Sequence, residues 1–130
     1  MYHITLDDQQ PDTHQDVVGR ANYGWNPDAS LEEMWEDNRQ IWRMARKVEA
    51  EGYVIFAHDG KIVMVGTIDR VVDAPKIPGK GPKRSIEGKV LRPGDLYHDV
   101  LVGKTTPFAG QSHRYVTSED VLRIAAGMFE

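Results

Sequence analysis

The sequence predicts a single α+β domain, in which a mixed α/β arrangement of short strands and helices forms a small barrel-like core. Three observations predict this fold. Residues 52–66 contain two apolar runs on either side of an Asp-Gly pair, which is typical of a β-hairpin. A helical pattern lies directly before this hairpin, and further short strand and helix patterns follow it. Residues 1–130 are long enough for one domain with its own core, and no repeat or linker divides them.

The clearest helical signal starts at Ser30. Ser30 and Glu33 fit a capping box, in which the hydroxyl and the carboxylate bind free backbone N–H groups of the first turn. Acidic residues follow in the first turns and basic residues come later, as the helix dipole favours. Gly52 is a typical helix stop. The pattern therefore predicts one helix over residues 30–52.

Strand and turn patterns predict the other elements in chain order. Polar composition makes residues 1–16 a partly flexible start. Both runs of the hairpin are almost continuously apolar, so both of its faces are expected to be covered. Strands are predicted at residues 2–6, 54–56, 62–72, 86–91 and 113–116, helices at 96–102 and 117–127, and loops at 7–16, 20–30 and 73–85.

Charge is distributed unevenly along the chain, whose formal net charge is −4. Residues 1–51 contain 11 acidic residues and 5 Lys or Arg, whereas residues 76–114 contain 8 Lys or Arg and 3 acidic residues. A basic face of this kind can follow a chain of phosphates even on an acidic molecule. An ordinary solvated surface is the alternative interpretation.

The sequence gives no support to several functional classes. Cysteine is absent, which excludes disulfides, thiolate catalysis and Cys-based zinc sites and fits a cytoplasmic protein. No apolar run is long enough to span a membrane, and the first residues do not resemble a secretory signal. The 5 histidines lack metal-site spacing, and no phosphate loop or nucleophile elbow occurs. We therefore expect no catalytic residue, cofactor, metal site or membrane partner.

The loop before the predicted helix carries the residues best suited to hold a flat ligand. Trp25 lies between Gly24 and Asn26, with Asn22 and Tyr23 close by. An accessible indole stacks on a nucleobase, and such a stack contributes roughly 1–3 kcal/mol. Amide side chains can then read the edge of the base, because they both donate and accept hydrogen bonds. A lid over the core is the alternative role for Trp25.

Basic residues are candidates for contacts with a nucleic-acid backbone. Flexible cations in the loop at 73–85 precede a predicted strand, which is typical of a phosphate clamp, although a solubilising loop is equally consistent. Arginines on the predicted helix can also reach a phosphate, but ion pairs with Glu36 explain them equally well. The backbone-contact candidates are Arg20, Arg39, Arg43, Lys80, Lys83, Arg84 and Ser85.

Three stretches of this chain resemble the EVE branch of the PUA-like superfamily, which also contains the YTH and ASCH domains. They are the loop GRANYGWN, the hairpin GYVIFAHDGKIVMVG with its continuation, and the later stretch KRSIEGKVLRPGDLYHDVLVGK. The last is similar to the C-terminal part of actinobacterial EVE-like domains that read modified cytosine. The resemblance covers residues 17–117.

This resemblance implies a PUA-like pseudobarrel of about five to six strands with flanking helices. It implies a non-catalytic nucleic-acid-binding module that flips a modified base, above all 5-methylcytosine in DNA, into an aromatic pocket. It also implies a nuclease partner, because some EVE-like domains are fused to HNH nucleases. The base-binding candidates that it suggests in this chain are Asn22, Tyr23, Trp25, Asn26 and His58.

Two other classes of function stay open. An ASCH-like enzyme acting on a small modified nucleoside needs a lysine and a carboxylate that converge in one pocket, although the ASCH pattern T-x-K-x-x-x-E is absent. An RNA-binding or protein-interaction domain is the other alternative, with the acidic N-terminal part contacting a basic partner.

Overall fold

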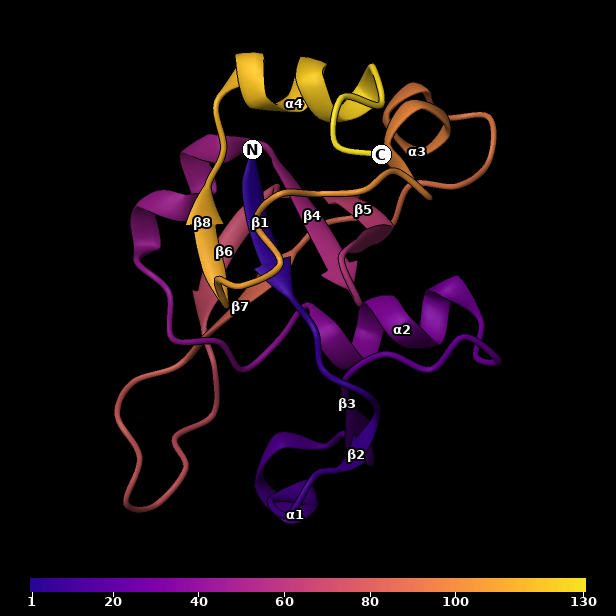
Figure 1. The fold of residues 1–130 in the computed structure, drawn as a ribbon. Helices are drawn as coiled ribbons and strands as arrows, with labels where there is room; N and C mark the ends of the chain where they lie inside the picture. Colours follow the sequence, from indigo (N-terminus) through magenta and orange to yellow (C-terminus); the bar gives the residue numbers. More distant parts are fainter.

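The computed structural model describes the whole chain, Met1–Glu130, and contains a four-stranded mixed sheet with helices packed around it (Figure 1). The strands of this main sheet are β1 (Tyr2–Thr5), β4 (Tyr53–His58), β5 (Lys61–Thr67) and β8 (His113–Tyr115). Their order is β5-β4-β1-β8, with β1 parallel to β4 and antiparallel to β8. The N-terminal strand therefore lies inside the sheet. This mixture of sheet and helices confirms the predicted α+β class.

The central hairpin confirms its prediction. Asp59 and Gly60 form the turn between β4 and β5 and both have positive φ, 50° and 78°. Within β4, Phe56 packs into one core cluster and Ile55 into a second cluster. Alternate residues of a strand point to opposite faces, so these two clusters lie on the two sides of the sheet. Both faces of the hairpin are therefore covered, as the continuous apolar runs predicted.

The strand predicted at 62–72 is two strands. The chain leaves the main sheet after Thr67, and β6 (Arg70–Asp73) pairs instead with β7 (Arg84–Glu87). The predicted basic loop is present as residues 74–83, which connect these two strands. Beyond β7, Val90 forms an isolated bridge with Gly66 of β5, so the strand predicted at 86–91 is also divided.

The prediction of one helix over residues 30–52 is wrong. The structure has α2 (Leu31–Asn38) and a separate 3-10 helix, η1 (Arg46–Glu51). Ser30 caps α2 as expected, with its Oγ accepting the Glu33 N–H at 3.2 Å. Past the helix, Trp42 exchanges both backbone hydrogen bonds with Arg84 of β7, each at 2.8 Å. Pairing with a strand that is distant in sequence therefore outweighs the local helical pattern.

A small lobe of short elements lies below α2 in Figure 1. It consists of α1 (Gln15–Val18) between β2 (Gln10–Pro11) and β3 (Asn22–Tyr23), and both strands lie where the sequence predicted loops. The loop between β6 and β7 extends toward the same end of the molecule (Figure 1). This approach of two segments from different parts of the chain positions the candidate site.

The C-terminal half confirms its predicted helices. These are α3 (Leu96–Leu101) and α4 (Ser118–Ala125), and Thr117 and Asp120 form a capping box at the start of α4. Both helices cover the second core cluster, to which Leu101 and Ile124 belong. All helices of the structure fall short of the length and apolar character that a membrane span needs.

The paired strands form an open arrangement and not a closed barrel. Backbone bridges continue the main sheet beyond β5 to Val90, and the strand pair β6–β7 to Trp42. No strand pairing joins β8 to β6 or β7.

Candidate nucleic-acid interface

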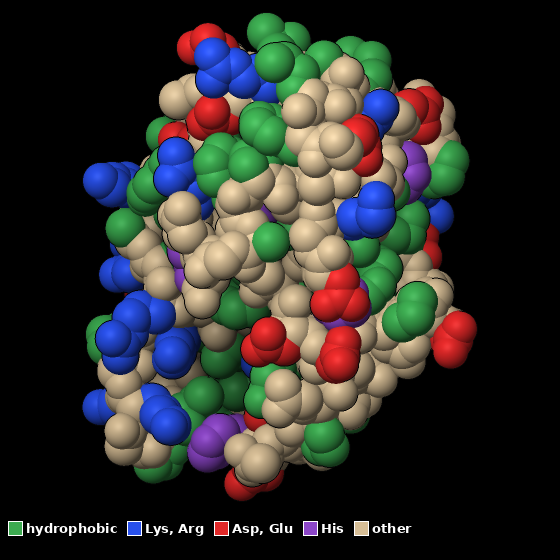
Figure 2. All heavy atoms as spheres, viewed as in Figure 1, with side chains coloured by type: hydrophobic (Ala, Val, Ile, Leu, Met, Phe, Trp, Pro, Cys, Tyr) green, Lys and Arg blue, Asp and Glu red, His purple; other side chains and the backbone are tan.

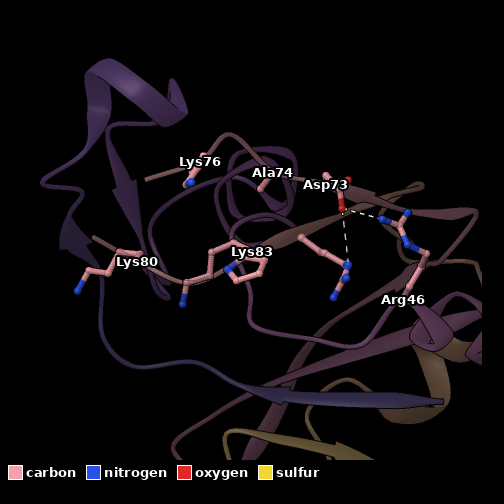
Figure 3. A pocket seen from close by; sticks show the side chains of 8 residues that line it. Arg46, Asp73, Ala74, Lys76, Lys80 and Lys83 are labelled. Carbon is pink, nitrogen blue, oxygen red and sulfur yellow. Dashed lines mark hydrogen bonds and ion pairs between the residues drawn. The ribbon is translucent and has the colours of Figure 1, made fainter. Parts of the chain in front are cut away.

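Basic side chains line a pocket between the two ends of the loop that joins β6 and β7 (Figure 3). The pocket has a volume of about 490 Å³ and its wall contains one acidic side chain, Asp73. We call it the basic pocket. Its cationic residues are Arg46, Lys76, Lys80, Lys83 and Arg84.

Only two of these five cations contact the single carboxylate, Asp73. Arg46 Nη2 lies 2.8 Å from Asp73 Oδ1, and Arg84 Nε lies 3.7 Å from the same oxygen (Figure 3). Arg84 is also fixed by a 2.6 Å hydrogen bond from its Nη1 to the Met44 carbonyl. The three lysines form no ion pair. The pocket thus has two positioned arginines and three lysines without an ion-pair partner, which favours binding of an anion.

A second pocket adjoins the basic pocket and shares Lys80 and Lys83 with it. It has a volume of about 260 Å³, and we call it the inner pocket. Figure 2 shows a hollow on this face with Lys and Arg side chains along one rim and apolar side chains at its floor. The other lining residues come from the small lobe, from the segment after α2 and from the basic loop: Asp12, Thr13, His14, Arg20, Tyr23, Ile41 and Ile77.

A buried ion pair forms one wall of the inner pocket. Arg20 Nε donates to Asp12 Oδ2 at 2.6 Å, and the two side chains are only 9% and 7% exposed. The backbone N–H of His14 donates to Asp12 Oδ1, and Arg20 Nη1 donates to the carbonyls of Asp37 and Gln40. Burial alone would raise the pKa of the Asp12 carboxyl, but the hydrogen bonds from Arg20 and His14 outweigh it and lower the pKa. Asp12 therefore stays ionised at neutral pH and both side chains are fixed.

The apolar wall of the inner pocket contains a strained residue. Ile41 has a φ of 67°, a conformation that a β-branched residue rarely adopts and that costs on the order of 1–3 kcal/mol. Its N–H donates to Ser85 Oγ at 3.2 Å, while the pairing of Trp42 with Arg84 holds the next residue. On the opposite segment, Ile77 is buried and anchors the basic loop. Contacts on both sides therefore keep this wall in place.

Several sequence-predicted residues meet at these two pockets. Arg20 and Tyr23 line the inner pocket, Arg84 lines the basic pocket, and the predicted lysines Lys80 and Lys83 line both. These residues come from β3 and the segment before it, from the basic loop and from β7, so the fold joins two separate predictions into one surface.

The other backbone-contact candidates lie at the margin or in the interior. Ser85 is buried, and its Oγ accepts a hydrogen bond from the Ile41 N–H. The Arg39 guanidinium binds Glu36 at 3.0 Å and the carbonyl of Ile86. Arg43 is exposed and borders the loop, because a Cβ atom placed on Gly81 would lie 3.5 Å from Arg43 Nη2.

The structure does not bring the five base-binding candidates to one pocket. Trp25 is half-buried against the first core cluster, as the alternative role of a lid over the core requires. Asn26 donates from Nδ2 to Gln9 Oε1 at 3.1 Å. Asn22 lies at a shallow hollow lined by acidic residues of α2. Trp25, Asn26 and His58 line none of the pockets.

His58 belongs to a separate cluster of potential metal ligands. One ligand atom from each of Asp8, His58 and Asp59 lies within 4.8 Å of the others. The two ring nitrogens of His58 face different carboxylates, Nε2 toward Asp8 at 2.7 Å and Nδ1 toward Asp59 at 3.7 Å. Only the Asp8 carboxylate is within hydrogen-bond distance of the His58 ring, and the Asp59 carboxylate lies beyond it.

Sequence reasoning missed part of the site. It did not identify Asp12, His14, Ile41 or Ile77 as site residues, and its backbone-contact candidates left out Arg46 and Lys76. A lone isoleucine at position 77 within a Pro/Gly/Lys-rich loop was the one available signal, because such a residue needs a buried partner.

Comparisons of this chain with models of known protein families, with curated proteins and with solved structures find no match.

Proposed function

We propose that this protein is a non-catalytic nucleic-acid-binding module whose phosphate contacts lie in the basic pocket. The observation that carries the proposal is the lining of this pocket by five cations and one acid. Side chains of Arg and Lys beside an open hollow are the usual contacts of a nucleic-acid backbone. Each phosphate that they neutralise releases counterions, which favours binding strongly at low salt.

The neighbouring inner pocket supports a polymer or nucleotide ligand over a simple anion. Tyr23 supplies an aromatic ring, while Ile41 and Ile77 supply an apolar wall directly beside the shared lysines. Nucleic acids combine a charged backbone with flat apolar bases, and proteins bind them with cations next to aromatic side chains. A small inorganic anion would leave this second pocket without a role.

As the finer part of the proposal, the ligand is DNA containing 5-methylcytosine, which the resemblance to EVE domains suggests. Burying one methyl group against Ile41 and Ile77 contributes about 0.8 kcal/mol, so methylation should strengthen binding roughly fourfold. The proposal includes a PUA-like pseudobarrel. Its support is that isolated backbone bridges extend the paired strands to Val90 and to Trp42. A nuclease partner is part of the same proposal.

A binding titration tests the proposed function. Anisotropy of labelled DNA duplexes with and without 5-methylcytosine, and of matched single-stranded DNA and RNA, is measured at several salt concentrations. We expect the logarithm of the affinity to fall with the logarithm of salt with a slope of about −3 to −5, because three to five phosphates are contacted. Binding without salt dependence, or no binding, contradicts the proposal; tighter binding of RNA favours the RNA-binding alternative.

A lysine variant localises the contact. We predict that replacing Lys76, Lys80 and Lys83 together by Gln reduces the salt slope by about 3, because each lysine loses one phosphate contact. The matched control replaces three lysines outside both pockets, Lys61→Gln, Lys89→Gln and Lys104→Gln, and changes the net charge equally. Equal losses in both variants would show that only the overall charge matters.

One observation favours an enzyme as the second candidate. Lys83 and the Asp12 carboxylate line the same inner pocket, which is the convergence that an ASCH-like nucleoside hydrolase needs. The lowered pKa of Asp12 and its pairing with Arg20 favour a binding role over proton transfer. Incubation with N-acylated and methylated nucleosides, followed by chromatography, distinguishes an enzyme from a binding module. A product that forms with the parent protein and is lost in Lys83→Ala supports the enzyme.

A further inference from the structure

The inner pocket contains a polar edge that the phosphate-binding proposal does not use. Asp12 accepts one hydrogen bond on each carboxylate oxygen, from Arg20 Nε and from the His14 N–H, and each oxygen can accept another. Arg20 donates through Nε and Nη1, while its Nη2 has no partner in the protein. A negative acceptor and a positive donor thus lie side by side at the pocket wall.

The same pocket contains flat and apolar groups that suit an aromatic ring. The Arg20 guanidinium carbon lies 5.3 Å from the centroid of the Tyr23 ring, so both planar groups are held at one wall. Ile41 and Ile77 provide the apolar part of the lining. Aromatic rings and guanidinium planes are the groups on which proteins stack unpaired bases. The volume of about 260 Å³ suits one heterocycle and not a helical stack of several bases.

We propose that the inner pocket binds a single nucleobase that carries an exocyclic amino group, with the amino group on Asp12 and the adjacent ring acceptor on Arg20. This inference rests on the proposed function, because Lys80 and Lys83 link the inner pocket to the phosphates in the basic pocket. The base is extruded from its stack to reach the pocket, and Tyr23 replaces part of the lost stacking.

The arrangement of charges determines which bases fit. Cytosine and adenine each present an amino donor next to a ring nitrogen acceptor, which complements a carboxylate beside a guanidinium. Thymine presents a carbonyl where the amino group would lie, so its oxygen would face the Asp12 carboxylate. We therefore expect cytosine or adenine to bind at least about tenfold more tightly than thymine, in line with the discrimination of one well-placed bidentate contact.

Methyl NMR of the full chain tests this pocket directly. The probes are single-stranded thymine oligonucleotides with one central cytosine, adenine, thymine or abasic site. With cytosine or adenine, ring currents should shift the methyl signals of Ile41 and Ile77, whereas Ile124 in the second core cluster should not move. Equal shifts for the abasic strand, or shifts with thymine alone, overturn the inference.

Variants of Tyr23 separate stacking from folding. Tyr23→Ala should remove the preference for cytosine or adenine over the abasic strand, and Tyr23→Phe should retain it, because the Tyr23 hydroxyl makes only a 3.4 Å contact with Gln10. Tyr115→Ala, which truncates an exposed tyrosine on β8, is the matched control and should leave the preference unchanged.

The outcomes distinguish this inference from the proposed function. Salt-dependent binding of all four oligonucleotides with equal affinity overturns the base pocket and leaves the phosphate-binding module. No binding of any oligonucleotide, together with no shift of Ile41 and Ile77 on addition of free deoxycytidine, overturns both. Shifts of Ile41 and Ile77 with free deoxycytidine, but no binding of oligonucleotides, support the pocket and favour the nucleoside enzyme in place of the nucleic-acid module.

Discussion

Asp12 and Arg20 show how one pair of side chains can hold a fold and shape a site. The pair joins the segment after β2 to the segment before β3, and Arg20 also binds two carbonyls near the end of α2. Removing one partner of a buried ion pair is costly because it leaves the other charge without compensation. For this reason the proposed tests alter Tyr23 and the lysines, and leave the ion pair intact.

His3 is a buried histidine whose titration affects the stability of the fold. It is fully buried, and its Nε2 lies 2.9 Å from Thr106 Oγ1. Burial, and after it the charge of Arg114, lower the pKa of His3 from 6.5 to about 4. The unfolded chain therefore takes up a proton at a pH where the folded chain does not, and the folded state loses stability as the pH falls.

We predict that the free energy of unfolding falls by about 3 kcal/mol as the pH drops from 6.5 to 4, because His3 stays neutral in the fold. Urea unfolding across this range measures the loss. His3→Gln cannot titrate and should show a flatter profile. His113, whose pKa burial and Lys83 also lower, remains in both proteins and provides the common background. Parallel profiles for the two proteins would contradict the role of His3.

At the scale of elements, the segment between α2 and η1 determines the site. Residues 39–45 leave the helical path, and Trp42 among them pairs with Arg84 of β7, which places Ile41 at the inner pocket. The strain at Ile41 is retained because Ser85 and the Trp42–Arg84 bridge hold its backbone on both sides. The basic loop is attached to the same β7, so one strand positions both walls.

A substitution at Gly88 tests how the segment after β7 is joined to the main sheet. A Cβ atom at Gly88 would lie 2.0 Å from the Thr67 carbonyl oxygen, so the backbone must move. We predict that Gly88→Ala lowers the free energy of unfolding by roughly 2 kcal/mol or more, because it disrupts the Thr67–Lys89 hydrogen bond of 2.8 Å. Gly110→Ala is the control, since nothing lies within 4 Å of its Cβ position. Equal urea midpoints for the two variants would contradict this.

At the scale of the whole molecule, the charges are separated. The basic pocket contrasts with the hollow beside α2, where Glu32, Glu33, Glu36 and Asp37 are grouped. In an acidic protein such a separation orients a polyanion toward one surface and repels it from the rest. Asp37 has a raised pKa, because burial and then its acidic neighbours Glu33 and Glu36 outweigh the attraction of Arg20.

We predict that Glu32→Gln, Glu33→Gln and Glu36→Gln together raise the association rate with DNA severalfold at low salt, because the repulsive field weakens. The increase should disappear at high salt, where charges further apart than the Debye length are screened. Stopped-flow fluorescence at low and high salt measures both rates. An increase that persists at high salt would instead indicate a direct contact between α2 and the DNA.

Local signals explain what the sequence predicted correctly. The Asp-Gly turn, the caps at Ser30 and Thr117 and the Pro/Gly/Lys composition of the loop each act within a few residues. Such signals located the hairpin, the start of α2, α3, α4 and the basic loop. They also identified the shared lysines, because a charged loop is visible in composition alone.

The sequence by itself determined the α+β class, the central hairpin and the unequal distribution of charge, since these depend on neighbours along the chain. Tertiary structure alone decided where the predicted helix is interrupted, and it alone brought Asp12, Tyr23, Ile41 and Ile77 to one pocket. The physical reason is that the pairing of residues near 42 with β7 and the approach of the basic loop to the small lobe are contacts between distant segments. Their free energy exceeds local helix propensity, and no pattern within either segment reveals it.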